Sequence, residues 1–231
     1  MTALPVLPES FATTRLAVHT LAENALSAAR HAAIGRIGLQ ASSLGIETPA
    51  FGDDQRVVAV EGNGRVELVD RRGGVERRSP ISTVRAAAAF LDVTPGVPAG
   101  LWHPVSSAGF DDSLSIDPAA LNALAAWYGF VGDALAGLAA SGAPLDPLTL
   151  WPEHLDLATS GTGVNYGGSP GDTHIGVPYL YVGPHTRPYP AAGGTYWNES
   201  FGAALRYDEI ESLAHAVAFF VRGFTLTANG G

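Results

Sequence analysis

The chain contains no cysteine, and this absence removes several classes of chemistry. With no cysteine among 231 residues, a disulfide framework, a zinc site built on thiolates and a cysteine nucleophile are all excluded. Lysine is absent as well, so all thirteen basic residues are arginine. Charged residues make up only 15% of the chain and hydrophobic residues 46%. This is the composition of a globular protein and not of a disordered one.

Long hydrophobic runs are also missing. The opening MTALPVLPES has neither a basic start nor an apolar stretch of signal-peptide length. No later window approaches the roughly 18 continuous apolar residues of a membrane span. We therefore expect a soluble cytoplasmic protein with no membrane partner. A chain of this length buries roughly 70% of its unfolded surface, so a sizeable hydrophobic core is expected.

Positive charge is scarce in the second half of the chain. Residues 1–116 hold 10 arginines against 12 acidic residues, and residues 117–231 hold 3 against 10, so the net charge of −9 divides into −2 and −7. Because an acidic surface repels phosphate, nucleic acid is not an expected partner. The one basic cluster has four arginines between residues 71 and 78, interleaved with glycine and glutamate. We interpret it as the solvated end of a hairpin.

The first half has the pattern of a helix, antiparallel strands and a second helix. Residues 11–34 are typical of a helix that ends at Gly35, although Thr20 and Glu23 form a capping pair that would start it later. Strand-like runs follow at 37–41, 56–60, 65–69 and 75–78, and an Asn-Gly turn favours a hairpin between the second and third. Ser79 and Pro80 predict the start of a second helix that ends before Pro95.

The second half repeats this layout after a connection rich in proline and glycine at residues 95–116. Asp117 and Pro118 predict the start of a long helix that Gly142 ends. Strands are expected at 148–158, 163–167, 177–183 and 195–206, followed by a helix from Asp208. Short connections favour antiparallel pairing. We expect an α+β fold with two similar helix–strands–helix halves, residues 1–94 and 117–231, either as two domains or packed as one.

A resemblance to a known family lies between Trp151 and Pro184. Its motifs are Trp-Pro-Glu-His-Leu-Asp-Leu-Ala at 151–158, Ser-Pro-Gly-Asp at 169–172 and Pro-Tyr-Leu-Tyr-Val-Gly-Pro at 178–184. They resemble a domain-of-unknown-function family of GC-rich bacteria, and the order of elements along the chain is similar to a broader group of that kind. In the family a tryptophan follows the last motif, where this chain has His185. The resemblance implies a shared fold and brings no activity with it.

Histidine and carboxylate side chains gather in the same segment. If residues 151–158 form a strand, alternation places His154 and Asp156 on one face and Glu153 on the other. A His-x-Asp pair aimed into a cavity suits a histidine base oriented by a carboxylate, or a metal site. The predicted ligands of a divalent metal are His154, Asp156, His174 and His185. The alternative is that these are ordinary loop and strand-end residues, and no organic cofactor is expected.

Aromatic side chains accompany this set. Tyr179 and Tyr181 share one face of a predicted strand, and alternation in a sheet would let further aromatic residues join them. We predict a small-molecule cavity lined by Trp151, Tyr166, Asp172, Tyr179 and Tyr181. The alternative is an ordinary aromatic core.

Other candidate residues are interpreted as structural. Residues 167–171 match the Gly-x-Ser-x-Gly nucleophile pattern, but Pro170 has no N–H with which to build an oxyanion hole, so we interpret them as a turn. His19 and His31 lie on the first predicted helix and are expected to face solvent.

Two functions from different classes remain open. The first is a hydrolase or isomerase, with or without a metal, in which His154, Asp156 and Glu153 are catalytic. The second is a non-catalytic domain that binds a small molecule or another protein. The sequence decides neither whether the protein is an enzyme nor its oligomeric state.

Overall fold

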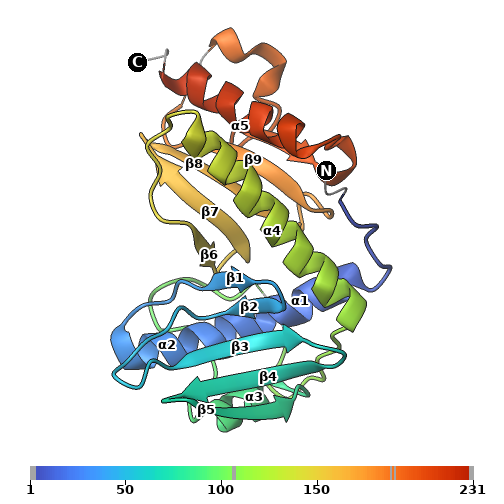
Figure 1. Ribbon diagram of the computed structural model, residues 1–231, viewed down its shortest axis with the longest axis vertical. Helices are drawn as coiled ribbons and strands as arrows, with labels where there is room; N and C mark the ends of the chain where they lie inside the picture. The colour runs from blue at the N-terminus through green and yellow to red at the C-terminus, as the bar shows by residue number, and fades with distance from the viewer. Residues whose placement is uncertain (1–3, 106–107, 188, 190, 229–231) are drawn as a thin grey trace. The chain divides into compact units, whose positions relative to one another are not determined.

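The protein has an α+β fold. The computed structural model describes residues 4–105, 108–187, 189 and 191–228. It contains two five-stranded antiparallel sheets, with strand orders β1-β2-β3-β4-β5 and β10-β9-β8-β7-β6 (Figure 1). Each half of the chain runs helix, five strands, helix. The fold class and the two similar halves predicted from the sequence are confirmed.

The chain folds into two compact units. The proximal unit holds residues 5–126 and 150–155, and the distal unit holds the rest of the described chain. The division falls inside a helix, whereas the sequence suggested boundaries at residues 94 and 116. The described residues of the connection, 95–105 and 108–116, belong to the proximal unit.

The proximal unit begins with a continuous helix that changes type in its middle. It consists of α1 (Phe11–Leu21), a π-helical turn η1 (Ala22–Leu26) and α2 (Ser27–Ile34). Gly35 ends it in the left-handed conformation with φ 69°, as predicted. The later start at Thr20 and Glu23 is wrong, because both residues lie inside the helix. The solvent-facing position expected for His19 is also wrong, since this side chain is only 8% exposed.

The first sheet is a meander of hairpins. Its strands are β1 (Gln40–Ser42), β2 (Gly45–Glu47), β3 (Val57–Gly62), β4 (Val66–Arg72) and β5 (Val75–Pro80). β3 and β4 pair from Val57↔Arg71 to Gly62↔Val66, so the predicted Asn-Gly hairpin is confirmed. β5 is an edge strand and tolerates Pro80 at its end. The second helix, α3 (Val84–Leu91), therefore begins later than predicted, with Thr83 Oγ1 accepting from Ala86 N at 3.1 Å.

The distal unit has a sheet with helices on one face. Its strands are β6 (Thr149–Trp151), at the boundary of the unit, β7 (Asp156–Gly161), β8 (Val164–Ser169), β9 (Tyr179–Pro184) and β10 (Ala203–Arg206). Figure 1 shows α4 (Pro118–Ala140) and α5 (Leu213–Ala228) crossing the same face of β8 and β9. Two glycines permit this packing. A Cβ on Gly168 would lie 2.3 Å from Val131 of α4, and one on Gly223 would lie 2.8 Å from Val182 of β9.

The closing segment differs from its prediction. The single strand expected over 195–206 is replaced by η2 (Ala191–Tyr196) and the short β10. After β10, η3 (Tyr207–Glu209) precedes α5, which starts at Leu213 and not at Asp208. In this helix Phe220 is buried, whereas Leu213 is 38% exposed. By its length and composition alone, helix α4 could cross a membrane. Half of its most apolar 18-residue stretch is buried within the protein.

Candidate functional site

The predicted strand that carries His154 and Asp156 is interrupted between them. β6 ends at Trp151, a turn follows, and β7 begins at Asp156. Pro152 has no N–H to donate to a neighbouring strand, and Leu155 adopts φ 53°, which reverses the chain. The alternation that would place both side chains on one face is therefore wrong. His154 is exposed, and Asp156 is buried.

Asp156 is instead paired with a tyrosine of the distal sheet. The Tyr181 hydroxyl donates a hydrogen bond to Asp156 Oδ2. The ring reaches this position by lying across β8 at Gly167, where a Cβ would approach the Tyr181 hydroxyl to 2.7 Å. Successive residues of a strand point to opposite faces. Gly168 therefore admits Val131 of α4 on the helix-covered face, and Gly167 admits Tyr181 on the other.

A second tyrosine–aspartate pair, Tyr179 and Asp172, lies beside the first. The Tyr179 hydroxyl donates to Asp172 Oδ2 at 2.6 Å, and Asp172 Oδ1 accepts from the backbone N–H groups of His174 at 2.6 Å and Ile175 at 2.8 Å. Burial alone would raise the pKa of Asp172, but the hydrogen bonds from Tyr179 and the two N–H groups outweigh it, and the pKa is lowered. Burial and the adjacent Asp172 carboxylate raise the pKa of Tyr179. Asp172 is thus a fixed negative charge beside a neutral phenol.

Phe201 completes an aromatic cluster with the two tyrosines. Its ring centroid lies 6.1 Å from that of Tyr179 and 6.5 Å from that of Tyr181, and the two tyrosine centroids are 6.3 Å apart. Tyr181 and Phe201 remain partly exposed beside buried Ile175 and Ala204. We name this set the tyrosine–aspartate face: Asp156, Asp172, Tyr179, Tyr181 and Phe201.

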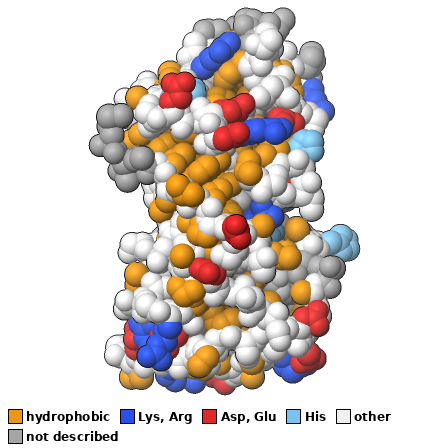
Figure 2. Space-filling view, turned by 90° about the vertical axis from the view of Figure 1, so that its right-hand side faces the viewer, with side chains coloured by type: hydrophobic (Ala, Val, Ile, Leu, Met, Phe, Trp, Pro, Cys, Tyr) orange, Lys and Arg blue, Asp and Glu red, His pale blue; other side chains and the backbone are white. Residues whose placement is uncertain are grey.

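A histidine and a glutamate border this face. His174 Nε2 lies 2.9 Å from Glu199 Oε2, and its ring centroid is 6.4 Å from that of Phe201. Arg206 approaches the other oxygen of Glu199 at 3.6 Å. Together with partly exposed Tyr181 and Phe201, these groups give a face that combines aromatic surface with carboxylates. The upper part of Figure 2 shows one side of the protein, on which hydrophobic side chains gather with acidic and arginine side chains beside them.

The predicted metal ligands are not brought together. Within residues 4–105, 108–187, 189 and 191–228, no group of three or more histidine, aspartate or glutamate side chains is arranged to hold a metal ion. His174 contacts Glu199, and His185 Nε2 lies 2.9 Å from Asn165 Oδ1. The i, i+2 spacing of His154 and Asp156 fails as a ligand pair because the turn at Pro152 to Leu155 separates their environments.

The remaining predicted residues lie elsewhere. Tyr166 is buried on the helix-covered face of β8, with its ring centroid 6.3 Å from that of Phe220. It is part of the core and not of a cavity shared with Tyr179 and Tyr181. Trp151 is exposed at the end of β6, and Glu153 is half-buried in the following turn. Both belong to the proximal unit. Of the five predicted ligand-binding residues, the structure thus joins Asp172, Tyr179 and Tyr181.

The proximal unit contains a buried polar pair that the sequence did not reveal. His19 Nε2 lies 2.9 Å from the Pro152 carbonyl oxygen and 3.8 Å from Glu23 Oε1. Burial lowers the pKa of His19, and nearby His154 and Arg15 lower it further, while Glu23 and the Pro152 carbonyl oppose the shift. The i, i+4 spacing of His19 and Glu23 was the available signal. It was missed because an exposed helical pair has the same spacing.

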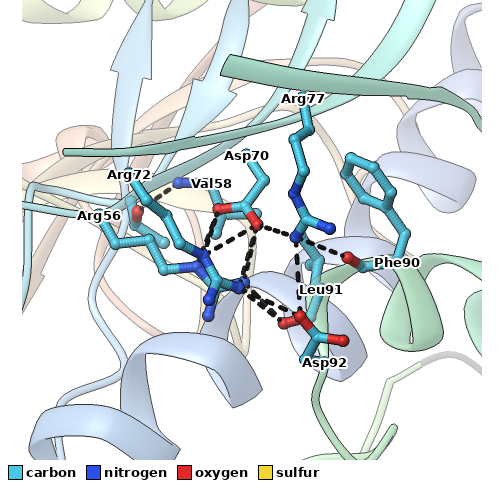
Figure 3. A network of polar contacts seen from close by, with 9 residues as sticks. Arg56, Val58, Asp70, Arg72, Arg77, Phe90, Leu91 and Asp92 are labelled. Carbon is cyan, nitrogen blue, oxygen red and sulfur yellow. Dashed lines mark hydrogen bonds and ion pairs between the residues drawn. The ribbon is translucent and has the colours of Figure 1, made fainter. Parts of the chain in front are cut away.

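The arginines of the first sheet form an ion-pair network with a structural role. Asp70 of β4 is buried and accepts hydrogen bonds from Arg56, Arg72 and Arg77 (Figure 3). Arg56 also donates to the Leu91 carbonyl oxygen at 2.6 Å, and Arg77 donates to that of Phe90 at 3.1 Å. These contacts attach the carboxyl end of α3 to the sheet. The helix dipole favours cations at this end of a helix. Residues 71–78 do form the end of a hairpin, as predicted. The prediction that their arginines are simply solvated is wrong for Arg72 and Arg77, which contact the buried Asp70.

Comparison of the chain with protein-family models, curated proteins and solved structures finds no match. The resemblance carried by residues 151–158, 169–172 and 178–184 therefore stays a prediction, and the function has to be argued from the side chains themselves.

Proposed function

We propose that the distal unit binds a small organic molecule with a positively charged group at the tyrosine–aspartate face. The observation that carries the proposal is the pairing of two tyrosines with two aspartates on the sheet face opposite α4 and α5. A strand face that served only as core would gain more from apolar side chains, because buried carboxylates are costly to desolvate. Polar groups converging on aromatic surface are typical of small-molecule sites.

The charge of the unit favours a cation over an anion. Residues 127–149 and 156–231 contain 8 acidic residues and 3 arginines, and Glu199 adds a carboxylate at the border of the face. The partly exposed rings of Tyr181 and Phe201 present electron-rich faces, which attract ammonium groups with about 0.5–2 kcal/mol each. A phenol that donates a hydrogen bond to a carboxylate becomes more electron-rich, so Asp156 strengthens this attraction through Tyr181.

A second candidate function is supported by the His174–Glu199 contact. A carboxylate 2.9 Å from an imidazole nitrogen fixes the tautomer of a general base. His174 is exposed and lies beside the aromatic cluster. If the bound molecule is also a substrate, His174 replaces His154 as the candidate base, in hydrolytic or isomerising chemistry.

Ligand-observed NMR with a panel of small amines tests the binding proposal. We expect an amine to bind the wild-type protein, and Asp156→Asn to weaken that binding about tenfold, because the variant weakens the attraction of the Tyr181 ring for an ammonium group, which is worth about 0.5–2 kcal/mol. Tyr207→Phe is the matched control, since Tyr207 packs against Trp127, at a centroid distance of 5.6 Å, and not in this cluster. Equal affinity of the wild type and Asp156→Asn for every amine would refute the proposal.

A further inference from the structure

The first helix of the proximal unit buries an unusual number of polar side chains. They lie along α1, η1 and α2 at Thr14, His19, Thr20, Glu23, Asn24 and Ser27. Some are satisfied within the helix: Asn24 Nδ2 donates to the Thr20 carbonyl oxygen at 2.9 Å and Ser27 Oγ to that of Glu23 at 2.7 Å. His19 and Glu23 instead reach other segments of the unit.

Glu23 lies at the centre of this set, in the π-helical turn. Its side chain is completely buried. Oε1 accepts one hydrogen bond from Trp102 Nε1 at 3.1 Å and another from the backbone N–H of Val105 at 2.9 Å. Turns of π-helix are rare and occur frequently at functional sites. Together, the turn and the buried carboxylate mark this position as more than a packing contact.

Both hydrogen-bond donors come from a segment that contains neither helix nor strand. We name residues 93–105 the strap. Its backbone contacts the same helix at Gly96, whose N–H donates to the Asn24 carbonyl oxygen at 3.0 Å. Close to the Glu23 contact, Leu101 is 51% exposed and Val105 is 53% exposed. The strap thus lies against the helix with solvent on its outer side.

A buried carboxyl group is a costly anchor for such a segment, because its burial costs free energy that apolar residues of similar volume would not lose. The complete burial of Glu23 therefore calls for a further reason. The two N–H groups from Trp102 and Val105 converge on a single carboxylate oxygen. A guanidinium or amidinium group presents the same kind of N–H donors and adds the positive charge that the strap lacks.

We propose that the strap occupies a binding site on its own helix, and that a small cation with N–H donors displaces it by binding to Glu23. In this arrangement Trp102 is an internal competitor, and His19 and Asn24 belong to the wall of the site. The site belongs to the proximal unit and is independent of the tyrosine–aspartate face of the distal unit.

Two probes of equal charge test the proposal on the full chain. Methylguanidinium carries N–H donors, and tetramethylammonium has none. Binding is measured by chemical-shift titration, and hydrogen exchange of residues 96–105 reports whether the strap leaves the helix. We expect methylguanidinium to bind and to raise the exchange rate of the strap, while tetramethylammonium does neither. Trp102→Phe removes one N–H of the competitor, so it should raise the affinity for methylguanidinium about fivefold to tenfold.

Glu23→Gln separates the charge from the hydrogen bonds. The glutamine oxygen still accepts from Trp102 and Val105, so the strap should stay protected while binding of methylguanidinium is lost. Tyr181→Phe, in the distal unit, should leave both measurements unchanged, which keeps this test distinct from the amine site. The proposal fails if tetramethylammonium binds equally well, if Trp102→Phe leaves the affinity unchanged, or if the probe binds without any change in exchange of the strap.

Discussion

Two adjacent glycines of β8 show how much a single residue decides in the distal unit. In the sequence, Gly167 and Gly168 belong to a pattern that resembles a nucleophile motif. In the structure, each removes a side chain from a different face, one for Tyr181 and one for Val131 of α4. Pro170, which has no N–H for an oxyanion hole, argues against a nucleophile at Ser169. Glycine is required at both positions because of contacts with Tyr181 and Val131. These residues are distant in sequence, so a local sequence pattern does not reveal the requirement.

Gly167→Ala is therefore expected to destabilise the distal unit. The added Cβ would lie 2.7 Å from the Tyr181 hydroxyl and 2.9 Å from the Ala158 Cβ, and overpacking of this kind costs about 1–3 kcal/mol. Gly176→Ala is the matched control, because a Cβ there meets nothing within 4 Å. Urea unfolding of both variants measures the difference in free energy of unfolding. Equal stability of the two variants would mean that Tyr181 does not lie across β8.

Asp70 is the residue on which the proximal ion-pair network depends. Burial alone would raise the pKa of its carboxyl group, but hydrogen bonds from Arg56, Arg72 and Arg77 lower it below the ordinary value of 3.8. A carboxyl group with a lowered pKa contributes stability above its ordinary pKa, and this contribution is lost as the pH falls through the folded value. The network is therefore fully stabilising above about pH 4 and weakens in stronger acid.

Asp70→Asn should be among the most damaging single changes in the chain. It leaves three guanidinium groups without their buried carboxylate, and breaking a buried ion pair on one side costs about 3–5 kcal/mol. Asp92→Asn is the control. Asp92 contacts Arg72 and Arg77 at 3.6 and 3.7 Å with its side chain 70% exposed, and exposed pairs contribute about 0–1 kcal/mol. Thermal unfolding of both variants at neutral pH makes the comparison, and similar losses would exclude the network as the cause.

At the scale of elements, the sequence predicts long periodic segments well and interruptions poorly. The helix of residues 11–34, the hairpin of β3 and β4 and the long helix α4 were all expected and are present. The turn between Trp151 and Asp156 was not expected, although Pro152 within an apolar run is a known sign against a strand. This turn separates His154 from Asp156. Most of the predicted catalytic site depended on these two residues lying together, so that part of the prediction is wrong. Tyr179 and Tyr181 were found because they alternate along one regular strand, β9, whereas Asp172 lies in the loop that precedes this strand.

The burial of the first helix makes the stability of the proximal unit depend on pH. His19 has a pKa below the ordinary 6.5 because burial disfavours its charged form. Neutral His19 is thus favoured in the folded state, and its contribution to stability is present above pH 6.5 and lost as the pH falls below it. We expect the free energy of unfolding to decrease as the pH falls below about 6.5.

His19→Gln should flatten this part of the pH profile. Glutamine can still donate a hydrogen bond to the Pro152 carbonyl oxygen but does not titrate. His103→Gln is the control, since His103 is exposed. Denaturant unfolding at several pH values gives the profiles. A His19→Gln profile as steep as that of the wild type would show that other groups cause the dependence.

For the whole molecule, composition predicts the class of protein, whereas contacts between residues distant in sequence determine how the chain divides into two units. The absence of cysteine and the large apolar fraction required a hydrophobic core without cross-links, and the alternation of elements predicted two similar halves. The sequence placed the boundary in the connection rich in proline and glycine. The strap, which overlaps that connection, is held by Glu23 and Asn24 of the first helix, and such long-range hydrogen bonds cannot be read from composition.

The two units should respond separately to the variants described above. Residues 118–126 of α4 belong to the proximal unit and residues 127–140 to the distal unit. Asp70→Asn should therefore raise hydrogen exchange in β3, β4 and the first half of α4, by about a hundredfold for a loss of roughly 3 kcal/mol. β7 and β8 should stay protected, and Gly167→Ala should give the reverse pattern. Peptide-resolved exchange measures both halves of α4 in one experiment. A uniform increase along the whole chain would contradict this, because it would show that the two sheets unfold as one cooperative structure.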